Sequence, residues 1–241
     1  MIRAISLIGN PAVRLSIAPC LVLALAANPA AAQFDDDQLG GWYTYQWTLN
    51  RSGSTLGWQG DLQLRYWDVG GDTEQRLLRS GLTWQPGRIK YTLGVAHVVS
   101  EAFGPSSADS EERRLYQEAL WPAQRIGEHG FLVHRIRTEE RYLEGQDLRT
   151  RLRYLVGYNH VLNQTTLTQG ALYLAFSNEL FVNLERGIGG GRQVDYFDRN
   201  RFAAGLGYSL TDGLRIQLSY MRQSLDSNRK DQLQLNVIHT F

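Results

Sequence analysis

The sequence predicts an all-β chain that forms a single transmembrane, antiparallel, up-and-down β-barrel. From Gly41 to Phe241 apolar and polar residues alternate with a period of two, the pattern of strands with two different faces. Many alternating segments run for about 10–13 residues, which suits a tilted membrane strand better than a globular strand of about 5–6. A soluble sandwich with its apolar face inside is the alternative. Aromatic residues near segment ends, as at membrane interfaces, also favour the barrel: Trp42, Trp47, Trp67, Trp84, Trp121, Tyr142 and Tyr220.

The first 32 residues are expected to be a secretory signal peptide. Arg3 and Arg14 precede an apolar stretch at 21–26, and the segment ends in three alanines, a small-residue pattern that signal peptidases accept. The apolar stretch is too short to span a membrane as a helix. Residues 33–40 then form a short acidic leader, and residues 41–241 are expected to form the barrel.

Eleven alternating segments follow one another through the barrel region. The closing segment is the clearest, because Leu233, Leu235 and Val237 share one face while Gln234 and Asn236 share the other. Turn residues separate the segments, as at 50–53, 86–87 and 211–213. The expected strands lie near 41–49, 55–68, 74–85, 88–100, 111–121, 129–143, 148–159, 172–185, 201–210, 214–221 and 232–241.

This count conflicts with the even number of strands that is usual for a bacterial single-chain barrel. With Phe241 on the periplasmic side, segment 41–49 would begin outside the cell. Either that segment is not a full strand, which gives ten, or one strand has been missed, which gives twelve. The short turn near 50–54 supports pairing of 41–49 with 55–68. We therefore expect ten to twelve strands, and twelve is favoured.

Several short motifs resemble those of a known family. They include His134-Arg135-Ile136-Arg137-Thr138-Glu139-Glu140-Arg141, then Arg149-Thr150-Arg151-Leu152-Arg153-Tyr154, Ser177-Asn178-Glu179-Leu180 and Phe197-Asp198-Arg199-Asn200-Arg201. With these motifs the chain resembles the bacterial outer-membrane barrels grouped as domain-of-unknown-function family 2490. The resemblance implies a barrel in the bacterial outer membrane and brings no established activity. Outer-membrane barrels also commonly end in an aromatic residue that their assembly machinery recognises, so Phe241 is expected to contact that machinery.

Arginine dominates the face that would point into the lumen. The inward acidic residues are expected to be Asp61, Glu118, Glu139, Glu179 and Glu185, fewer than the inward basic ones. These charges could form a salt-bridge network that closes and stiffens the barrel, or a basic interior that admits anions. Glu179 is expected to pair with Arg199 or Arg201. The candidate ion-pair and anion-binding residues are Arg135, Arg137, Glu139, Arg141, Arg149, Arg151, Arg153, Glu118, Glu179, Arg199 and Arg201.

The remaining functional classes find little support in the sequence. No histidine falls on the inward register beside a serine or an acid, so we expect no enzyme of the hydrolase kind. No metal site and no cofactor are expected, because ligand spacings are absent. A net charge of +1 gives no indication of nucleic-acid binding. Three hypotheses remain: a narrow anion-preferring channel or binding barrel, a structural or envelope-interaction barrel with an occluded lumen, and, third, a lipid-modifying enzyme. Outer-membrane lipid and small anionic solutes are the expected partners.

Overall fold

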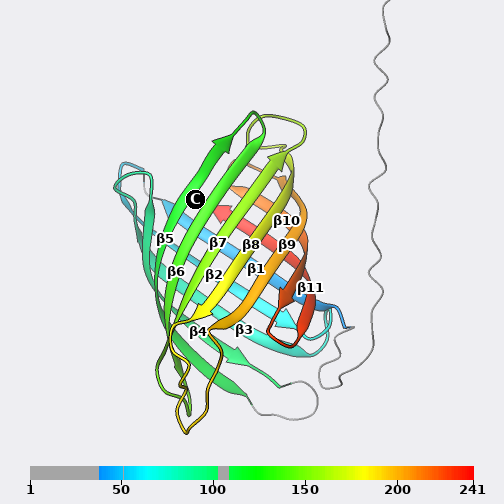
Figure 1. Ribbon diagram of the computed structural model, residues 1–241. Helices are drawn as coiled ribbons and strands as arrows, with labels where there is room; N and C mark the ends of the chain where they lie inside the picture. The colour runs from blue at the N-terminus through cyan, green and yellow to red at the C-terminus, as the bar shows by residue number, and fades with distance from the viewer. Residues whose placement is uncertain (1–37, 51, 103–108) are drawn as a thin grey trace, which may run out of the picture. The chain divides into compact units, whose positions relative to one another are not determined.

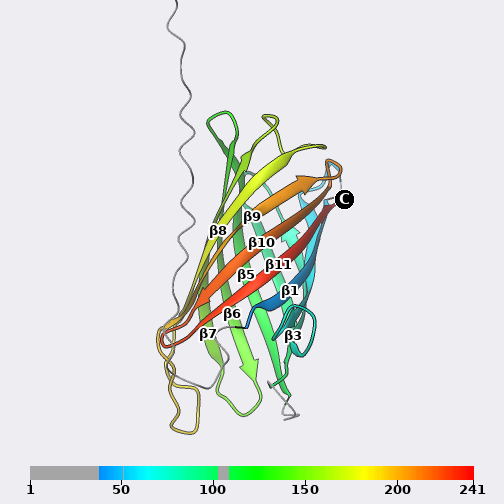
Figure 2. The same cartoon turned by 90° about the vertical axis from the view of Figure 1, so that its right-hand side faces the viewer.

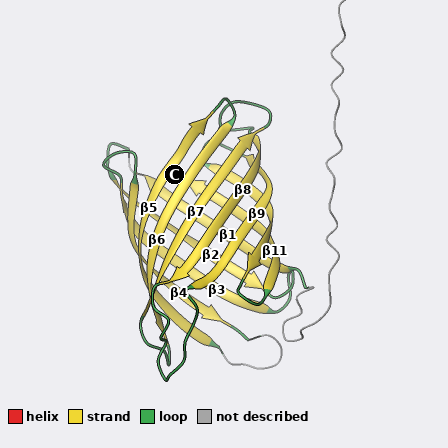
Figure 3. Cartoon of the chain, in the orientation of Figure 1, coloured by secondary structure: helices red, strands yellow, loops and turns green. Residues whose placement is uncertain are grey.

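The computed structural model describes residues 38–241 except 51 and 103–108, and this part of the chain contains strands and loops (Figure 3). The expected signal peptide at 1–32 and most of the leader at 33–40 lie outside the described residues. None of the described residues forms a helix long and apolar enough to cross a membrane. The strands are β1 (Gly40–Asn50), β2 (Leu56–Tyr66), β3 (Thr73–Trp84), β4 (Lys90–Ser100), β5 (Ser110–Ile126), β6 (Gly130–Leu143), β7 (Arg149–Val161), β8 (Leu172–Asn183), β9 (Phe197–Ser209), β10 (Leu214–Ser224) and β11 (Arg229–Thr240).

These strands close into one barrel, whose inclined strands are visible in Figures 1 and 2. Each strand pairs antiparallel with the next along the chain, from β1 and β2 to β10 and β11. The last seam is different, since β1 and β11 run parallel, with Gly40 opposite Gln232 and Thr48 opposite Thr240. The all-β barrel is therefore confirmed.

The expected range of ten to twelve strands is confirmed, but the described residues form eleven strands rather than the favoured twelve, and the pairing is antiparallel everywhere except between β1 and β11. If every neighbouring pair were antiparallel, a closed barrel would need an even number of strands. Here the first and last strands, β1 and β11, pair in parallel, so eleven strands close the barrel and none is missing. β1 is a full strand, paired along its length with both neighbours. As a result, Gly40 and Phe241 lie at opposite ends of the barrel. The backbone of Phe241 is fixed to β1, donating to the Thr48 carbonyl at 2.9 Å and accepting from the Asn50 amide at 3.3 Å.

The alternation of the sequence places apolar side chains on the outside of this barrel. In β4, Leu93 and Val95 are 58% and 59% exposed, whereas the inward Thr92 and Val98 are buried. The same contrast recurs around the barrel, with Leu82, Phe202, Leu206 and Leu218 exposed on the outer surface. A soluble protein would bury these faces, so the arrangement is the reverse of a sandwich.

β5 extends further than the sequence pattern indicates. The sequence pattern predicts an end at 121, before Pro122, but the strand continues to Ile126. Its pairing with β6 shifts between Trp121 and Gln124. Proline has no backbone N–H for the ladder, and an irregularity of this kind lets the strand continue past it.

A cluster of apolar side chains fills the lumen near the Phe241 end. Val161, Ala171, Tyr173 and Ala175 are buried there, with Phe131 and Leu167 packed against them. Tyr173 lies opposite Gly207 in the β8–β9 register. A Cβ atom at Gly207 would overlap the Tyr173 ring, so glycine is needed for this packing.

We expect Gly207→Val to lower the free energy of unfolding by about 1–3 kcal/mol, the usual cost of overpacking a filled interior. Tyr173 is 1% exposed, so a larger side chain at position 207 would press against a ring that is enclosed by its neighbours. Urea unfolding of the refolded protein in detergent, followed by tryptophan fluorescence, measures the effect. Gly87→Val is the matched control, because a Cβ at Gly87 meets no atom within 4 Å. Equal unfolding midpoints for the two variants would contradict this packing.

Candidate functional site

Charged side chains on the inner faces of β5 to β9 meet inside the barrel. Residues two apart in a strand share a face, so β6 and β7 each present a row of charged groups to the lumen. Across these strands Arg137 lies opposite Arg153, Glu139 opposite Arg151, and Arg141 opposite Arg149. Two of these three pairs oppose like charges, which destabilises a sheet unless carboxylates intervene.

Glu139 is the centre of the resulting ion-pair network. Its carboxylate accepts from Arg151 Nη2 at 2.6 Å and from Arg153 Nη1 at 2.5 Å. Arg137 and Arg114 approach it at 3.7 and 4.0 Å. The Glu139 side chain is 1% exposed. Four guanidinium groups therefore surround one carboxylate that water barely reaches.

Glu118 and Glu179 extend the network on one side of Glu139. Arg137 donates to Glu118 through Nε at 2.8 Å and Nη2 at 2.5 Å. Arg153 donates to Glu179 through Nη2 at 2.7 Å. Arg135 joins the two acids, with Nη2 2.5 Å from Glu179 and Nε 3.6 Å from Glu118.

Glu112 and Asp198 extend the network on the other side. Arg114 binds Glu112 with two hydrogen bonds of 2.8 Å, and Arg141 binds the same carboxylate. Asp198 accepts from Arg151 Nη1 at 2.8 Å and from Arg199 Nε at 3.1 Å. The five carboxylates and their arginines thus form one connected network along the wall from β5 to β9.

The structure places all eleven sequence-predicted candidates in the barrel interior. Arg137, Glu139, Arg141, Arg149, Arg151, Arg153, Glu118, Glu179 and Arg201 are buried. Arg135 and Arg199 are partly exposed and line the internal cavity described below. All but Arg149 and Arg201 take part in the connected network.

One expected ion pair, that of Glu179, and one expected inward placement, that of Glu185, are wrong. Glu179 lies opposite Arg201 in the β8–β9 register, yet its carboxylate pairs with Arg135 and Arg153 from the other side. Arg201 instead donates to Gln223 at 2.8 Å. Glu185 lies beyond the end of β8 and is exposed, where it accepts from the Thr150 amide at 2.7 Å.

Glu112 and Asp198 belong to the network but were not among the sequence candidates. Glu112 shares its strand face with Arg114 and Glu118, so alternation carried to the first residues of β5 would have found it. The sequence pattern does not indicate in the same way that Asp198 points into the lumen. Asp198 precedes Arg199 at the irregular start of β9, where the register with β8 shifts between Phe181 and Val182.

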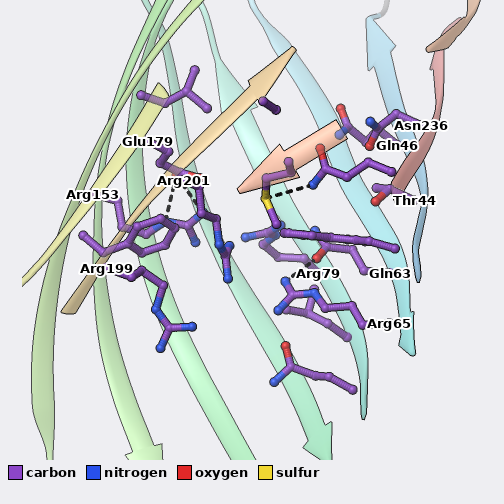
Figure 4. Close-up of a pocket in the computed structure, with 18 of the residues that line it drawn as sticks. Thr44, Gln46, Gln63, Arg65, Arg79, Arg153, Glu179, Arg199, Arg201 and Asn236 are labelled. Atoms are coloured by element: carbon purple, nitrogen blue, oxygen red, sulfur yellow. Dashed lines mark hydrogen bonds and ion pairs between the residues drawn. The ribbon is translucent and has the colours of Figure 1, made fainter. Parts of the chain in front are cut away.

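An internal cavity of about 410 Å³ lies beside the network. Its wall contains nine arginines and two glutamates. Figure 4 shows Arg153, Arg199 and Arg201 on one side, and Arg65 and Arg79 together with the neutral Thr44, Gln46 and Asn236 on the other. The neutral residues that line the cavity along β10, β11 and β1, here called the neutral wall, are Thr44, Gln46, Gln217, Gln234, Asn236 and Ile238. The cavity wall as a whole has a surplus of arginine.

Two of the arginines that line the cavity, Arg65 and Arg201, have no carboxylate within 4.0 Å among the described residues. Arg65 donates to Gln63 at 2.8 Å, and Arg201 donates to Gln223. Their guanidinium carbons lie 3.8 and 4.8 Å from the ring centroid of Trp42. Both guanidinium groups therefore contact an aromatic ring, and neither has an ion pair among the described residues.

Comparison with known proteins identifies the family. No curated protein and no solved structure matches the chain. The family described as "Protein of unknown function (DUF2490)" matches residues 39–234, which include all of β1 to β10 and the first half of β11. The chain, with its arginine-lined barrel, belongs to this family of unknown function.

Proposed function

We propose that the protein is a bacterial outer-membrane barrel whose interior admits or holds small anions. The observation that carries this proposal is the charge of the cavity wall, with nine arginines against two glutamates. Arginine remains protonated at any physiological pH and binds carboxylate or phosphate with two parallel hydrogen bonds. Rings of arginine are a known basis of anion preference in pores.

The outer surface of the barrel supports a location in a membrane. Leu82, Leu93, Val95 and Leu218 are between 51% and 73% exposed and point away from the lumen. A band of this kind matches the lipid-facing surface of outer-membrane barrels. The proposed partners are outer-membrane lipid around this band and the assembly machinery at β11 and Phe241. We propose no catalytic role.

A structural barrel with a closed lumen is the second candidate. It is favoured by the ion-pair network around Glu139 and by the apolar cluster around Tyr173, both of which occupy the interior. The cavity beside the network favours the first candidate, because it follows the β1–β11 seam from Trp42 to Gln46 and from Gln234 to Ile238.

Flux into liposomes separates the two candidates. Purified protein in liposomes should admit chloride faster than potassium, as reported by trapped dyes selective for each ion. Gln46→Glu and Asn236→Asp place a carboxylate on the neutral wall and should reduce the chloride-to-potassium flux ratio. Gln85→Glu, in the exposed turn after β3, is the control and should leave the ratio unchanged. Equal ratios in all three variants and the wild type would contradict the proposal, and absence of any flux would support the closed barrel.

A further inference from the structure

Arg65 and Arg201 carry charges that the rest of the network does not neutralise. Both are more than nine-tenths buried, and both line the 410 Å³ cavity. The other arginines of the cavity wall each have a carboxylate within 4.0 Å: Arg79, Arg114, Arg135, Arg141, Arg151, Arg153 and Arg199. A buried charge without a partner is unfavourable. An anion bound between Arg65 and Arg201 would therefore stabilise both guanidinium groups.

Hydrogen-bond donors without a partner lie around the Trp42 ring, which both guanidinium groups contact. Arg65 Nε and Trp42 Nε1 are buried without a partner among the described residues. Arg201 uses Nε for Gln223, and its two Nη groups form no hydrogen bond within the described part of the chain. Buried donors normally have partners, and a bound ligand is one explanation for a group of donors that lack them.

The surrounding side chains hold these donors in place. Trp42 packs against Ala203 and Met221 in a buried cluster. The guanidinium carbon of Arg201 lies 4.7 Å from the Phe181 ring centroid as well as 4.8 Å from that of Trp42. Arg65 is held by Gln63 and by the Trp42 ring. The donors are thus fixed before any ligand arrives, which reduces the entropic cost of binding.

We propose that Arg65 and Arg201, with Trp42 Nε1, form a binding site for a doubly charged oxyanion, namely a phosphate group. Two unpaired guanidinium groups match the charge of a phosphate dianion, and their N–H groups match its oxygens. The inference rests on the proposed function only in that solutes must reach the cavity. It adds a defined site to a general preference for anions.

Calorimetric titration of the refolded protein in detergent tests the site, with sodium phosphate as ligand and sodium chloride at equal ionic strength as comparison. We expect one phosphate per chain and at least tenfold weaker binding in both Arg65→Gln and Arg201→Gln. Arg149→Gln is the matched control, because Arg149 is also buried without a carboxylate within 4.0 Å but does not line the cavity. It should bind phosphate within twofold of the wild type. Glycerol 3-phosphate distinguishes a site for phosphate monoesters, which would bind it, from one for the free ion.

Thermal unfolding of the wild type with and without phosphate gives a second measurement of binding, which needs no variant. Phosphate should raise the unfolding temperature of the wild type, and chloride should not. In phosphate-free buffer Arg201→Gln should unfold at the same temperature as the wild type or higher, since it removes an unpaired charge. Equal losses of binding in all three variants, or no phosphate binding by the wild type, would overturn the site. Anion-selective flux in the same preparation would show that the proposed function survives that failure.

Discussion

Glu139→Gln is expected to lower the free energy of unfolding by about 3–5 kcal/mol, the usual effect of removing one partner from a buried ion pair. The substitution keeps the volume of the side chain but removes the charge that Arg151 and Arg153 contact at 2.6 and 2.5 Å. Arg137 and Arg114 also lose their nearest carboxylate neighbour on β6. The repulsion among the four guanidinium groups would then be offset only by their outer partners, in an interior that water barely reaches: Glu112, Glu118, Asp198 and Glu179.

Chemical unfolding of the refolded protein in detergent measures this loss. Glu140→Gln is the matched control, since Glu140 is the next residue of β6 and lies on the opposite face, where its nearest side-chain partner is Tyr142 at 3.4 Å. It should change the stability by less than about 1 kcal/mol, as expected for an exposed charge. A Glu139→Gln variant as stable as Glu140→Gln would show that the network does not hold the barrel together.

Leu218→Arg is expected to lower the free energy of unfolding by about 2–4 kcal/mol, because it places a charge on the outer surface near the middle of β10, which faces lipid if the proposed membrane location is correct. Leu218 is 51% exposed and lies opposite Leu235 on β11. The adjacent Gln217 points into the lumen and lines the cavity. Gln217→Arg should therefore have a smaller effect, because its charge stays in the polar interior.

Refolding into lipid vesicles, followed by urea titration, compares the free energies of unfolding of the two variants when the outer surface is in contact with lipid. Heat-modifiable migration on unboiled gels shows whether each has formed a closed barrel. Equal losses from Leu218→Arg and Gln217→Arg would mean that the outer surface does not contact lipid.

The faces of the strands could be predicted from the sequence, because the two-residue period fixes which side chains point together. Alternation alone predicts that Arg137 and Arg151 point into the lumen, and both are buried there in the structure. Alternation carries no information on which strand closes the barrel. The parallel pairing of Gly40–Thr48 with β11 therefore could not be predicted, and an even strand count was favoured instead.

The ion pairs of the network were harder to predict than the faces. Glu179 is directly opposite Arg201, yet the long side chains of Arg135 and Arg153 reach it from β6 and β7. An arginine spans the distance to more than one neighbouring strand, so register alone does not determine its partner. Arg201 is also held away from Glu179 by Gln223 and two aromatic rings. Contacts of this kind depend on three-dimensional packing.

The reversal potential of the wild-type protein in a planar bilayer tests the central claim most directly. Under a gradient of potassium chloride at low salt, where charges in the lumen are least screened, the sign of the potential shows which ion passes more readily. The arginine surplus of the cavity wall predicts a preference for chloride that declines as the salt concentration rises. A preference for potassium, or the absence of any conductance from a correctly folded barrel, would contradict the claim that the lumen admits anions.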